Sequence, residues 1–427
     1  MCIFRKNLML LNVYSPIMNL ENTSFYNFIM VGAGPAGLTA GIVAKRYGYS
    51  AIILEKGIIA GPKPRGEGMA HMPIVDEILG KDYLPSIGLR SHGGRVWHSP
   101  GGKQITTTYR DYPHYFFDWR KFIDRFVEIA HDLKVDIQYN REVIEPIEEN
   151  NVTIGVKYKN KEGKIRELYG NAILDCSGYE GIIGKNYGIP YEKMNCPIVK
   201  CLINNANYKL ENTPDLQFYF IGNGDLEYSP NFPQSVAYFF PLEEGRAEVG
   251  LMLRMGQVPN MKTVEIPSDS EVIRVWQKIK STYPGYSEFF KGAKIDYEEL
   301  TYLPNAKMVD CFVPNRGVVV VGDSAGFVNP FGSSGLYYSM EMAKIWVNMI
   351  SEKLNNDIKD FKFNEVLWNS ENITEFNIKF KNTEIFKQVD HYYNLIGAFE
   401  YKIFNKLRTA EKVNKKWDYI ETLLKKA

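Results

Sequence analysis

Two apolar runs that each end in glycine stand out in the hydrophobic pattern of the chain. Residues 28–31 precede Gly32-Ala-Gly-Pro-Ala-Gly37, and a helical pattern follows from Leu38 until Gly48. Residues 318–321 are four consecutive valines, followed by Gly322-Asp323. The first run predicts a strand that leads directly into a helix. The second predicts a strand buried on both faces, which is typical of a central position in a parallel sheet.

Between about residues 196 and 300, apolar and polar residues mostly alternate, which is the period of strands that bury one face. Residues 57–69 contain too many glycines and prolines for a helix or a central strand, so we expect a loop there. Helical periodicity appears at 118–130, at 271–280 and from Leu336 onward. The expected hairpins join 95–98 to 103–109, 152–158 to 164–169, and 236–240 to 246–253, and further strands are expected at 135–139 and 172–175.

The order of these elements predicts an α/β fold, in which a Rossmann-like domain carries an inserted antiparallel β-sheet domain and a C-terminal helical tail. We assign 24–84, 119–195 and 302–352 to the Rossmann-like domain, 85–118 and 196–301 to the inserted domain, and 353–427 to the helical tail. Residues 1–23 form an N-terminal extension that faintly resembles a signal peptide. Because Asn12 interrupts its short apolar stretch, we expect no leader there and consider Met18 a candidate start.

Composition and charge narrow the classes of function. The 427 residues are 45% hydrophobic and 24% charged, with a formal net charge of +1, so no nucleic-acid footprint is expected. The five cysteines are scattered and form no C-x-x-C pair. We therefore expect a protein of the reducing cytosol without disulfides or a metal site, in which Cys196 and Cys201 are buried strand thiols.

The tail carries a local excess of positive charge. Residues 401–427 contain eight Lys and Arg against three Asp and Glu, a net of +5. Such a stretch is either a solvated surface or a contact with an anionic membrane. No apolar run reaches the ~18 residues of a membrane span. The expected location is therefore the cytoplasm, with peripheral contact at the inner face of the cell membrane as the alternative for the tail.

The glycine motif has the spacing and context of a dinucleotide-binding turn. Gly32 allows a tight turn, Gly34 lets the backbone approach a diphosphate, and Gly37 lets helix and strand pack closely. The helix N-terminus offers free N–H groups to the phosphates. A second apolar strand, 51–54, ends in Glu55, eighteen residues after Gly37, where a carboxylate accepts hydrogen bonds from a ribose diol. The sequence therefore predicts a site for an adenosine diphosphate moiety.

Five further stretches accompany this motif. They are Arg120-x-Phe122-x-Asp124, Val143, Asp175-Cys-Ser-Gly178, Tyr238-Phe-Phe-Pro241 with Val249-Gly250, and Val321-Gly-Asp-Ser-Ala-Gly-Phe-Val-Asn-Pro330. Together they resemble the FAD-dependent geranylgeranyl reductase family, within the p-hydroxybenzoate hydroxylase-like flavoproteins, over residues 25 to about 350. The resemblance implies FAD as cofactor, with Asp323 at the ribityl chain and the helix that begins near Ser334 directed at the flavin ring.

The resemblance and the glycine motif together assign the site residues. The expected cofactor-binding residues are Gly32, Ala33, Gly34, Pro35, Ala36, Gly37, Glu55, Lys56, Arg65, Gly66, Glu67, Gly68, Arg120, Val143, Ser177, Gly178, Gly322, Asp323, Pro330, Ser333, Ser334, Gly335 and Leu336. The expected substrate pocket consists of Phe218, Phe220, Tyr238 and Phe240. No catalytic acid is identified, and Glu67 and His71 are the candidates for it.

Two loops depart from the family pattern. Lys63-Pro-Arg65-Gly66-Glu67-Gly68 has Arg65 where archaeal reductases typically carry Cys. Phe331-Gly-Ser-Ser-Gly-Leu336 stands where the family has Thr-Gly-Glu-Gly-Ile. Both loops lie near the flavin ring in relatives, so the departures bear on the reaction rather than on cofactor binding.

The resemblance implies an enzyme that reduces double bonds in the prenyl chain of a lipid or quinone precursor, with ferredoxin or NAD(P)H as electron donor. A flavin-dependent aromatic hydroxylase is the alternative, while a halogenase is disfavoured because the chain contains no Trp-x-Trp-x-Ile-Pro stretch. A non-catalytic prenyl-binding escort on the same fold is a third hypothesis. The complete set of three glycines, Glu55 and Asp323 argues against an escort.

Overall fold

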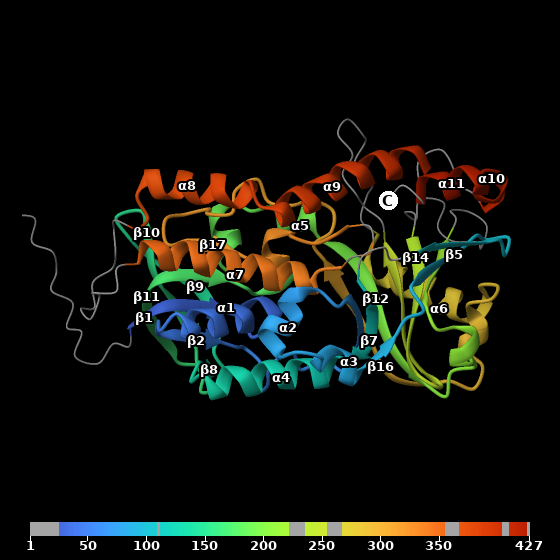
Figure 1. The fold of residues 1–427 in the computed structure, drawn as a ribbon, viewed down its shortest axis with the longest axis horizontal. Coiled ribbons are helices and arrows are strands. Elements are labelled where there is room, and N and C mark those ends of the chain that lie inside the picture. Colours follow the sequence, from blue (N-terminus) through green and yellow to red (C-terminus); the bar gives the residue numbers. More distant parts are fainter. Residues whose placement is uncertain are drawn as a thin grey trace, which may run out of the picture.

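The computed structural model describes residues 25–108, 112–221, 235–253, 267–330, 332, 334–354, 367–403 and 410–424. The expected N-terminal extension and the predicted site residue Ser333 lie outside these ranges. Two large sheets lie at opposite ends of the described structure and are bridged by helices along one side (Figure 1).

The first sheet contains the dinucleotide motif. Its strand order is β8-β2-β1-β11-β10-β9, and β17 also pairs with β11. The pairs among β8, β2, β1, β11 and β17 are parallel, whereas β9, β10 and β11 form an antiparallel meander. The bounds are β1 Phe25–Val31, β2 Ala51–Leu54, β8 Asp136–Gln138, β9 Glu142–Glu149, β10 Val152–Lys159, β11 Ile165–Asp175 and β17 Val318–Val320.

Two predictions for this sheet need correction, and one of its strands was missed. The valine run is buried as expected, but β17 is the outermost parallel strand of the sheet rather than a central one. Its free edge is covered by the segment that follows residue 308, where the Phe312 carbonyl oxygen accepts a hydrogen bond from the Val320 N–H (2.9 Å). Residues 164–169 and 172–175 are one continuous strand, β11, rather than two. Strand β9 was not predicted, since its Glu-rich sequence hides the alternation.

The second sheet has seven strands in the order β16-β12-β15-β14-β13-β5-β6. All its pairs are antiparallel except β13 with β5. Its expected hairpins, β5–β6 and β14–β15, are present, although β14 continues through Pro241 where a turn was expected. The bounds are β5 Gly94–His98, β6 Gln104–Thr108, β12 Cys196–Asn204, β13 Leu216–Ile221, β14 Ser235–Glu243, β15 Arg246–Leu253 and β16 Lys294–Leu303.

A small third sheet corrects the expected loop at 57–69. Residues Gly66–Ala70 form strand β3, which pairs with β7 (His114–Asp118), and β4 (Gly88–Arg90) lies on the other side of β7. The glycines of β3 allow side chains of β7 to pack closely against its backbone, since a Cβ added at Gly68 would lie 2.9 Å from both the His114 and Phe116 side chains. The segment is thus a short edge strand between the two large sheets.

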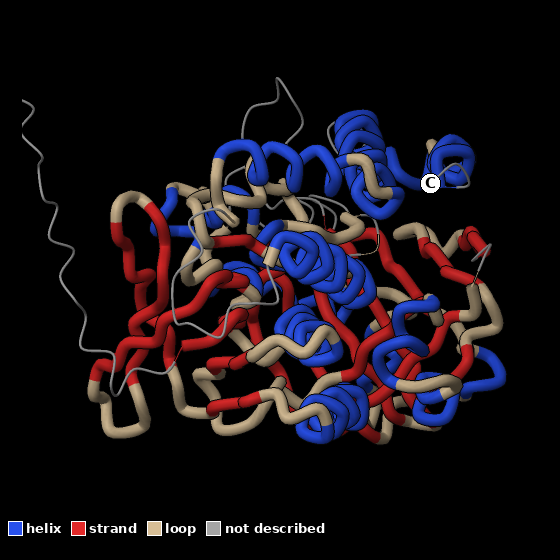
Figure 2. The backbone as a smooth tube through the Cα atoms, turned by 60° about the vertical axis from the view of Figure 1, so that its left-hand side comes forward, coloured by secondary structure: helices blue, strands red, loops and turns tan. Residues whose placement is uncertain are grey.

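Helices cover the first sheet and extend over the second (Figures 1 and 2). α1 (Pro35–Arg46) packs against both α7 (Leu336–Lys353) and α4 (Trp119–Asp132). In the tail, α9 (Glu384–Ile403) leads to α10 (Ala410–Lys415) and α11 (Trp417–Leu424), which bury Val413, Trp417 and Ile420 against Phe218 and Phe220 of β13. The remaining helices are α2 Pro73–Leu79, α3 Tyr83–Ile87, α5 Tyr191–Met194, α6 Asp269–Thr282 and α8 Ser370–Lys381.

Asp118 caps α4 and also joins two sheets. Its Oδ1 accepts from the Arg120 N–H (2.8 Å), while Oδ2 pairs with the Arg246 guanidinium (2.9 Å). We expect Asp118→Ala to lower the free energy of unfolding by about 1 kcal/mol, chiefly through the lost cap. Asp118→Asn keeps a capping oxygen and should lose less than half of that. Urea denaturation of both variants measures the difference; equal losses would assign the stabilisation to the ion pair.

Candidate active site

The dinucleotide turn has the geometry that its glycines predict. Gly32 adopts φ +103°, and a Cβ there would lie 2.7 Å from the Cys176 carbonyl oxygen. A Cβ on Gly37 would lie only 2.0 Å from the Gly32 carbonyl oxygen, whereas a Cβ on Gly34 would meet no atom within 4 Å. The turn is therefore closed by Gly32 and Gly37, and Gly34 alone faces open space, where a ligand's diphosphate can approach the N-terminus of α1.

Glu55 lies at the carboxyl end of β2, beside this turn. Its Oε2 accepts from the Ala33 N–H (2.9 Å) and its Oε1 from the Gly57 N–H (2.7 Å). The side chain is thus buried and oriented by backbone groups before any ligand binds. Each carboxylate oxygen keeps a second lone pair, so the predicted ribose contact remains available to it.

A second acid, Asp323, follows β17 in a 3₁₀ turn, Gly322–Ala325. Burial raises the pKa of its carboxyl group, while the Arg65 guanidinium opposes the rise. The N-terminal residues of α7, Gly335 and Leu336, lie on the same side. The two strand ends that carry Glu55 and Asp323 therefore meet at one crevice, as expected for the switch region of a doubly wound sheet.

One cavity of about 350 Å³ joins this crevice to the second sheet. Val143 and Ser177 line it at the first sheet, and Phe218, Tyr238 and Phe240 line it at the second. Further predicted site residues that line it are Gly32, Ala33, Gly34, Pro35, Ala36, Glu55, Lys56, Arg65, Glu67, Gly178, Asp323, Gly335 and Leu336. The glycine turn and an apolar wall thus belong to a single cavity.

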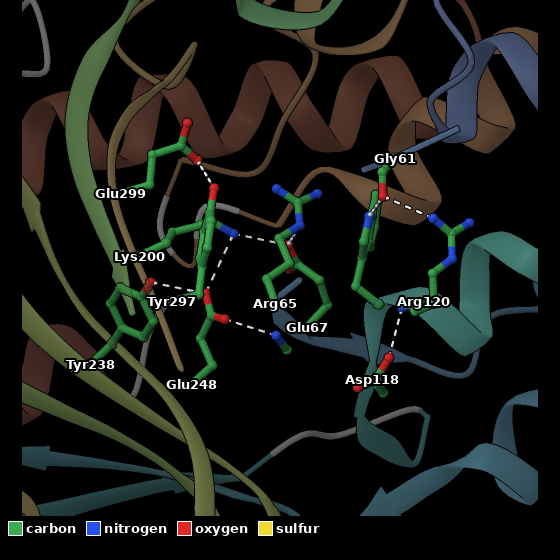
Figure 3. Close-up of polar contacts among 12 residues, drawn as sticks. Gly61, Arg65, Glu67, Asp118, Arg120, Lys200, Tyr238, Glu248, Tyr297 and Glu299 are labelled. Atoms are coloured by element: carbon green, nitrogen blue, oxygen red, sulfur yellow. Dashed lines mark hydrogen bonds and ion pairs between the residues drawn. The ribbon is translucent and has the colours of Figure 1, made fainter. Parts of the chain in front are cut away.

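Other predicted site residues do not line the cavity. Arg120 donates to the carbonyl oxygens of Ala60 (2.7 Å) and Gly61 (3.2 Å), so it supports the loop beside the cofactor crevice (Figure 3). His71 lies 2.7 Å from an Asp76 carboxylate oxygen, and Phe220 packs in the core against Trp417. The remaining predicted residues that do not line it are Gly37, Gly66, Gly68, Gly322, Pro330 and Ser334.

Sequence reasoning missed two charged residues of the site, Lys200 and Glu248. The Lys200 Nζ lies 2.9 Å from Glu67 Oε1 and 3.8 Å from Glu248 Oε1, and its side chain is 10% exposed (Figure 3). Arg65 Nε also lies 3.0 Å from Glu67 Oε1. A lone lysine in the apolar stretch 196–203 was the available signal, since an unpaired buried charge is too costly to be accidental.

The two carboxyl groups of this cluster have opposite electrostatic environments. Burial disfavours ionisation of Glu67, but the Lys200 and Arg65 charges outweigh it and lower its pKa. Burial raises the pKa of Glu248 to about 7, against the attraction of Lys200 and with added repulsion from Glu67. Near neutral pH, Glu67 is therefore a carboxylate, while Glu248 exchanges a proton.

The residues that line the cavity suit FAD by their chemistry and position. The open space at Gly34, the preset Glu55 carboxylate and Asp323 at the far strand end line one cavity and suit, respectively, the phosphates, the adenosine ribose and the ribityl chain. Residues 27–196, which carry the turn and Glu55, match the family of FAD dependent oxidoreductases. The chain is an FAD-dependent oxidoreductase.

Relatives of this oxidoreductase confirm the predicted resemblance to geranylgeranyl reductases. A digeranylgeranylglycerophospholipid reductase of Methanocaldococcus jannaschii is 25% identical over 92% of this chain and 90% of its own. Digeranylgeranylglycerophospholipid reductase 2 of Methanopyrus kandleri is 25% identical over 86% of this chain and 88% of its own.

Solved structures share the fold of the oxidoreductase. A geranylgeranyl bacteriochlorophyll reductase-like protein of Thermoplasma acidophilum superposes with a TM-score of 0.68 at 18% identity, over 92% of this chain and 96% of its own. The myxobacterial chondrochloren halogenase follows with a TM-score of 0.65 at 17% identity, over 93% and 90% of the two chains. Since a reductase-like protein and a halogenase share it, the fold does not distinguish between their reactions.

The described residues provide neither a membrane span nor a cluster of metal ligands. No helix among them is both long and apolar enough to cross a membrane. Within the same ranges, no group of three or more His, Cys, Asp or Glu side chains is placed to hold a metal ion.

Glu55 provides a test of the ribose site. We expect Glu55→Gln to raise the dissociation constant for FAD about tenfold, because a charge-assisted acceptor for hydroxyl groups becomes a neutral amide. Glu180→Gln is the matched control, since Glu180 also lines the cavity but pairs with Lys56 at its exposed edge. Fluorescence titration of the apoprotein with FAD measures both; equal weakening would contradict a specific ribose contact at Glu55.

Proposed function

We propose that this oxidoreductase saturates carbon–carbon double bonds in the prenyl chains of a geranylgeranyl-type lipid or lipid precursor. The observation that carries the proposal is the single cavity that joins the cofactor crevice to an apolar sheet face. That face is lined by Ile198, Phe218, Phe240, Met252 and Leu303. A prenyl chain, which has no polar atoms along its length, fits such a wall by apolar contact alone. The names of the 25% identical relatives support the same substrate class.

Bound FAD would supply the hydride for the reduction, as flavins do in other oxidoreductases. The chain's own residues position the two reactants. Gly34 and the N-terminus of α1 would hold the diphosphate, Glu55 the ribose, and Asp323 with the start of α7 the inner half of the cofactor. The apolar wall excludes water from the alkene, so that reducing equivalents reach carbon rather than solvent.

For the partners, we propose a ferredoxin or NAD(P)H as electron donor and peripheral contact with the inner face of the cell membrane. The basic tail supports the membrane contact. In α10, Val413 faces the second sheet, whereas Lys412 and Lys415 are exposed, and Lys416 follows them on the outer side. Cations on that outer surface would attract anionic headgroups.

The test is an anaerobic reduction with defined substrates. Purified protein should show a flavin spectrum and, after reduction with dithionite, should transfer hydrogen to a geranylgeranylated glycerophospholipid in detergent micelles, seen by mass spectrometry as a gain of two hydrogens per double bond. Failure without oxygen, together with oxygen-dependent hydroxylation of an aromatic compound, would replace the proposal by the hydroxylase alternative. A colourless protein that binds no FAD but binds the lipid would indicate an escort.

A further inference from the structure

Lys200 occupies an unusual position for a charged residue. It lies in β12, directly opposite Gly250 of β15, which in turn lies opposite Tyr238 of β14. Because side chains alternate along strands, Lys200 projects from the same face of β12 as Ile198, toward the apolar cavity that both residues line. The bare Gly250 between them leaves room for the Tyr238 ring, since a Cβ there would lie 2.5 Å from it. The ammonium group is thus at the border between the apolar wall and the charged cluster.

Behind the ammonium group lies a carboxyl group that is almost fully buried. Glu248 is 1% exposed, its Oε2 accepts from the Gly66 N–H (2.8 Å), and its Oε1 lies 3.3 Å from the Tyr238 hydroxyl and 3.8 Å from Lys200 Nζ. Burial raises the pKa of Glu248 to about 7. Two buried groups that can hold a proton are therefore adjacent, and Lys200 and Tyr238, which both approach Glu248 Oε1, both line the cavity.

We propose that Lys200 is the proton donor to the alkene and that Glu248 is the buried acid that reloads it. The inference rests on the proposed function, because reduction of an alkene requires one proton for each hydride. An N–H bond at Lys200 Nζ breaks and a C–H bond forms at one alkene carbon, while the other carbon receives the hydride of the reduced FAD. The neutral amine then takes the proton of the Glu248 carboxyl, and Glu248 is protonated again from solvent when product leaves.

A purely structural role is the rival explanation for the cluster. Lys200 and Glu248 both contact the 65–68 segment, through Glu67 and the Gly66 N–H, and so attach β3 to the second sheet. The substitution Lys200→Arg distinguishes a structural role of Lys200 from proton donation. It keeps the positive charge and the ion pair with Glu67, but a guanidinium does not release its proton in a protein.

The experiment compares Lys200→Arg with wild type in single-turnover oxidation of dithionite-reduced holoenzyme by the geranylgeranyl lipid, without oxygen. We expect Lys200→Arg to retain its melting temperature, FAD content and reduction potential but to oxidise at least about 100-fold more slowly, the lower range for loss of a general acid. Lys63→Arg is the control, since Lys63 precedes the same segment and pairs with Glu299 at the surface. It should behave as wild type.

Several outcomes would overturn the assignment. A Lys200→Arg enzyme as fast as wild type would leave Lys200 a structural residue. A slow enzyme with an equally shifted reduction potential would make Lys200 a partner of the cofactor instead. Glu248→Gln should keep the rate of the first turnover and slow steady-state turnover about tenfold; an unchanged steady state would remove Glu248 from the path. If wild type itself reduces no prenyl lipid, the proposed function has failed, which is distinct from these results.

Discussion

Replacing Gly34 by valine is expected to abolish stable FAD binding while the protein stays folded, whereas Gly37→Ala is expected to unfold the dinucleotide turn. Gly34 has φ −84°, which any residue adopts, and its missing Cβ faces open space. The valine side chain would occupy the place where a diphosphate meets α1, so we expect at least a 100-fold rise in the dissociation constant for FAD. The cost in folding should stay within about 1 kcal/mol, because only an N-cap changes.

Gly37→Ala adds a single carbon atom but in a place with no room. The new Cβ would lie 2.0 Å from the Gly32 carbonyl oxygen, a backbone atom that cannot rotate away. We expect a loss of about 3 kcal/mol or more, beyond the usual cost of overpacking, despite the better helix propensity of alanine. Urea denaturation and FAD titration of both variants distinguish the two effects. Equal stabilities for the two variants would contradict the close packing of β1 against α1.

The FAD crevice was predictable because its signals are local in sequence. Gly32, Gly34 and Gly37 fall within six residues, and their order fixes a strand, a turn and a helix without reference to the rest of the chain. Asp323 could be found for the same reason, since it directly follows a buried strand. In the structure, Gly32, Gly34 and Asp323 line one cavity, as the sequence predicted.

The charged cluster was not predictable as a unit, because its members come from three separate elements. Glu67 lies on β3, Lys200 on β12 and Glu248 on β15, and only the stacking of two sheets brings them within 4 Å. The same limit explains β3 itself, where the glycines and prolines of 57–69 indicate a loop until β7 is placed beside Gly66 and Gly68. The outer position of β17 in the sheet could not be predicted either, because the segment near Phe312 that covers its free edge has no strand pattern of its own.

Glu248 should make the stability of the protein fall as pH rises from about 4.5 to 7. Its pKa in the folded protein is about 7, above the value of 4.5 expected in the unfolded chain. A group with a raised pKa contributes its full stabilisation below pH 4.5 and loses it as pH rises toward 7, here about 3 kcal/mol. Glu67, whose pKa is lowered, acts in the opposite direction and below pH 4.5, outside this window.

Glu248→Gln removes this titration while keeping an acceptor for the Gly66 N–H. We expect the variant to be more stable than wild type by about 1–3 kcal/mol at pH 8 and by little at pH 5, measured by urea denaturation at both values. Glu162→Gln, in the exposed turn between β10 and β11, should show no pH-dependent difference from wild type. A constant difference for Glu248→Gln would mean that the carboxyl stays ionised in the fold. A gain confined to high pH would mean that the oxidoreductase keeps a destabilising acid beside Lys200, as expected where a proton source costs stability.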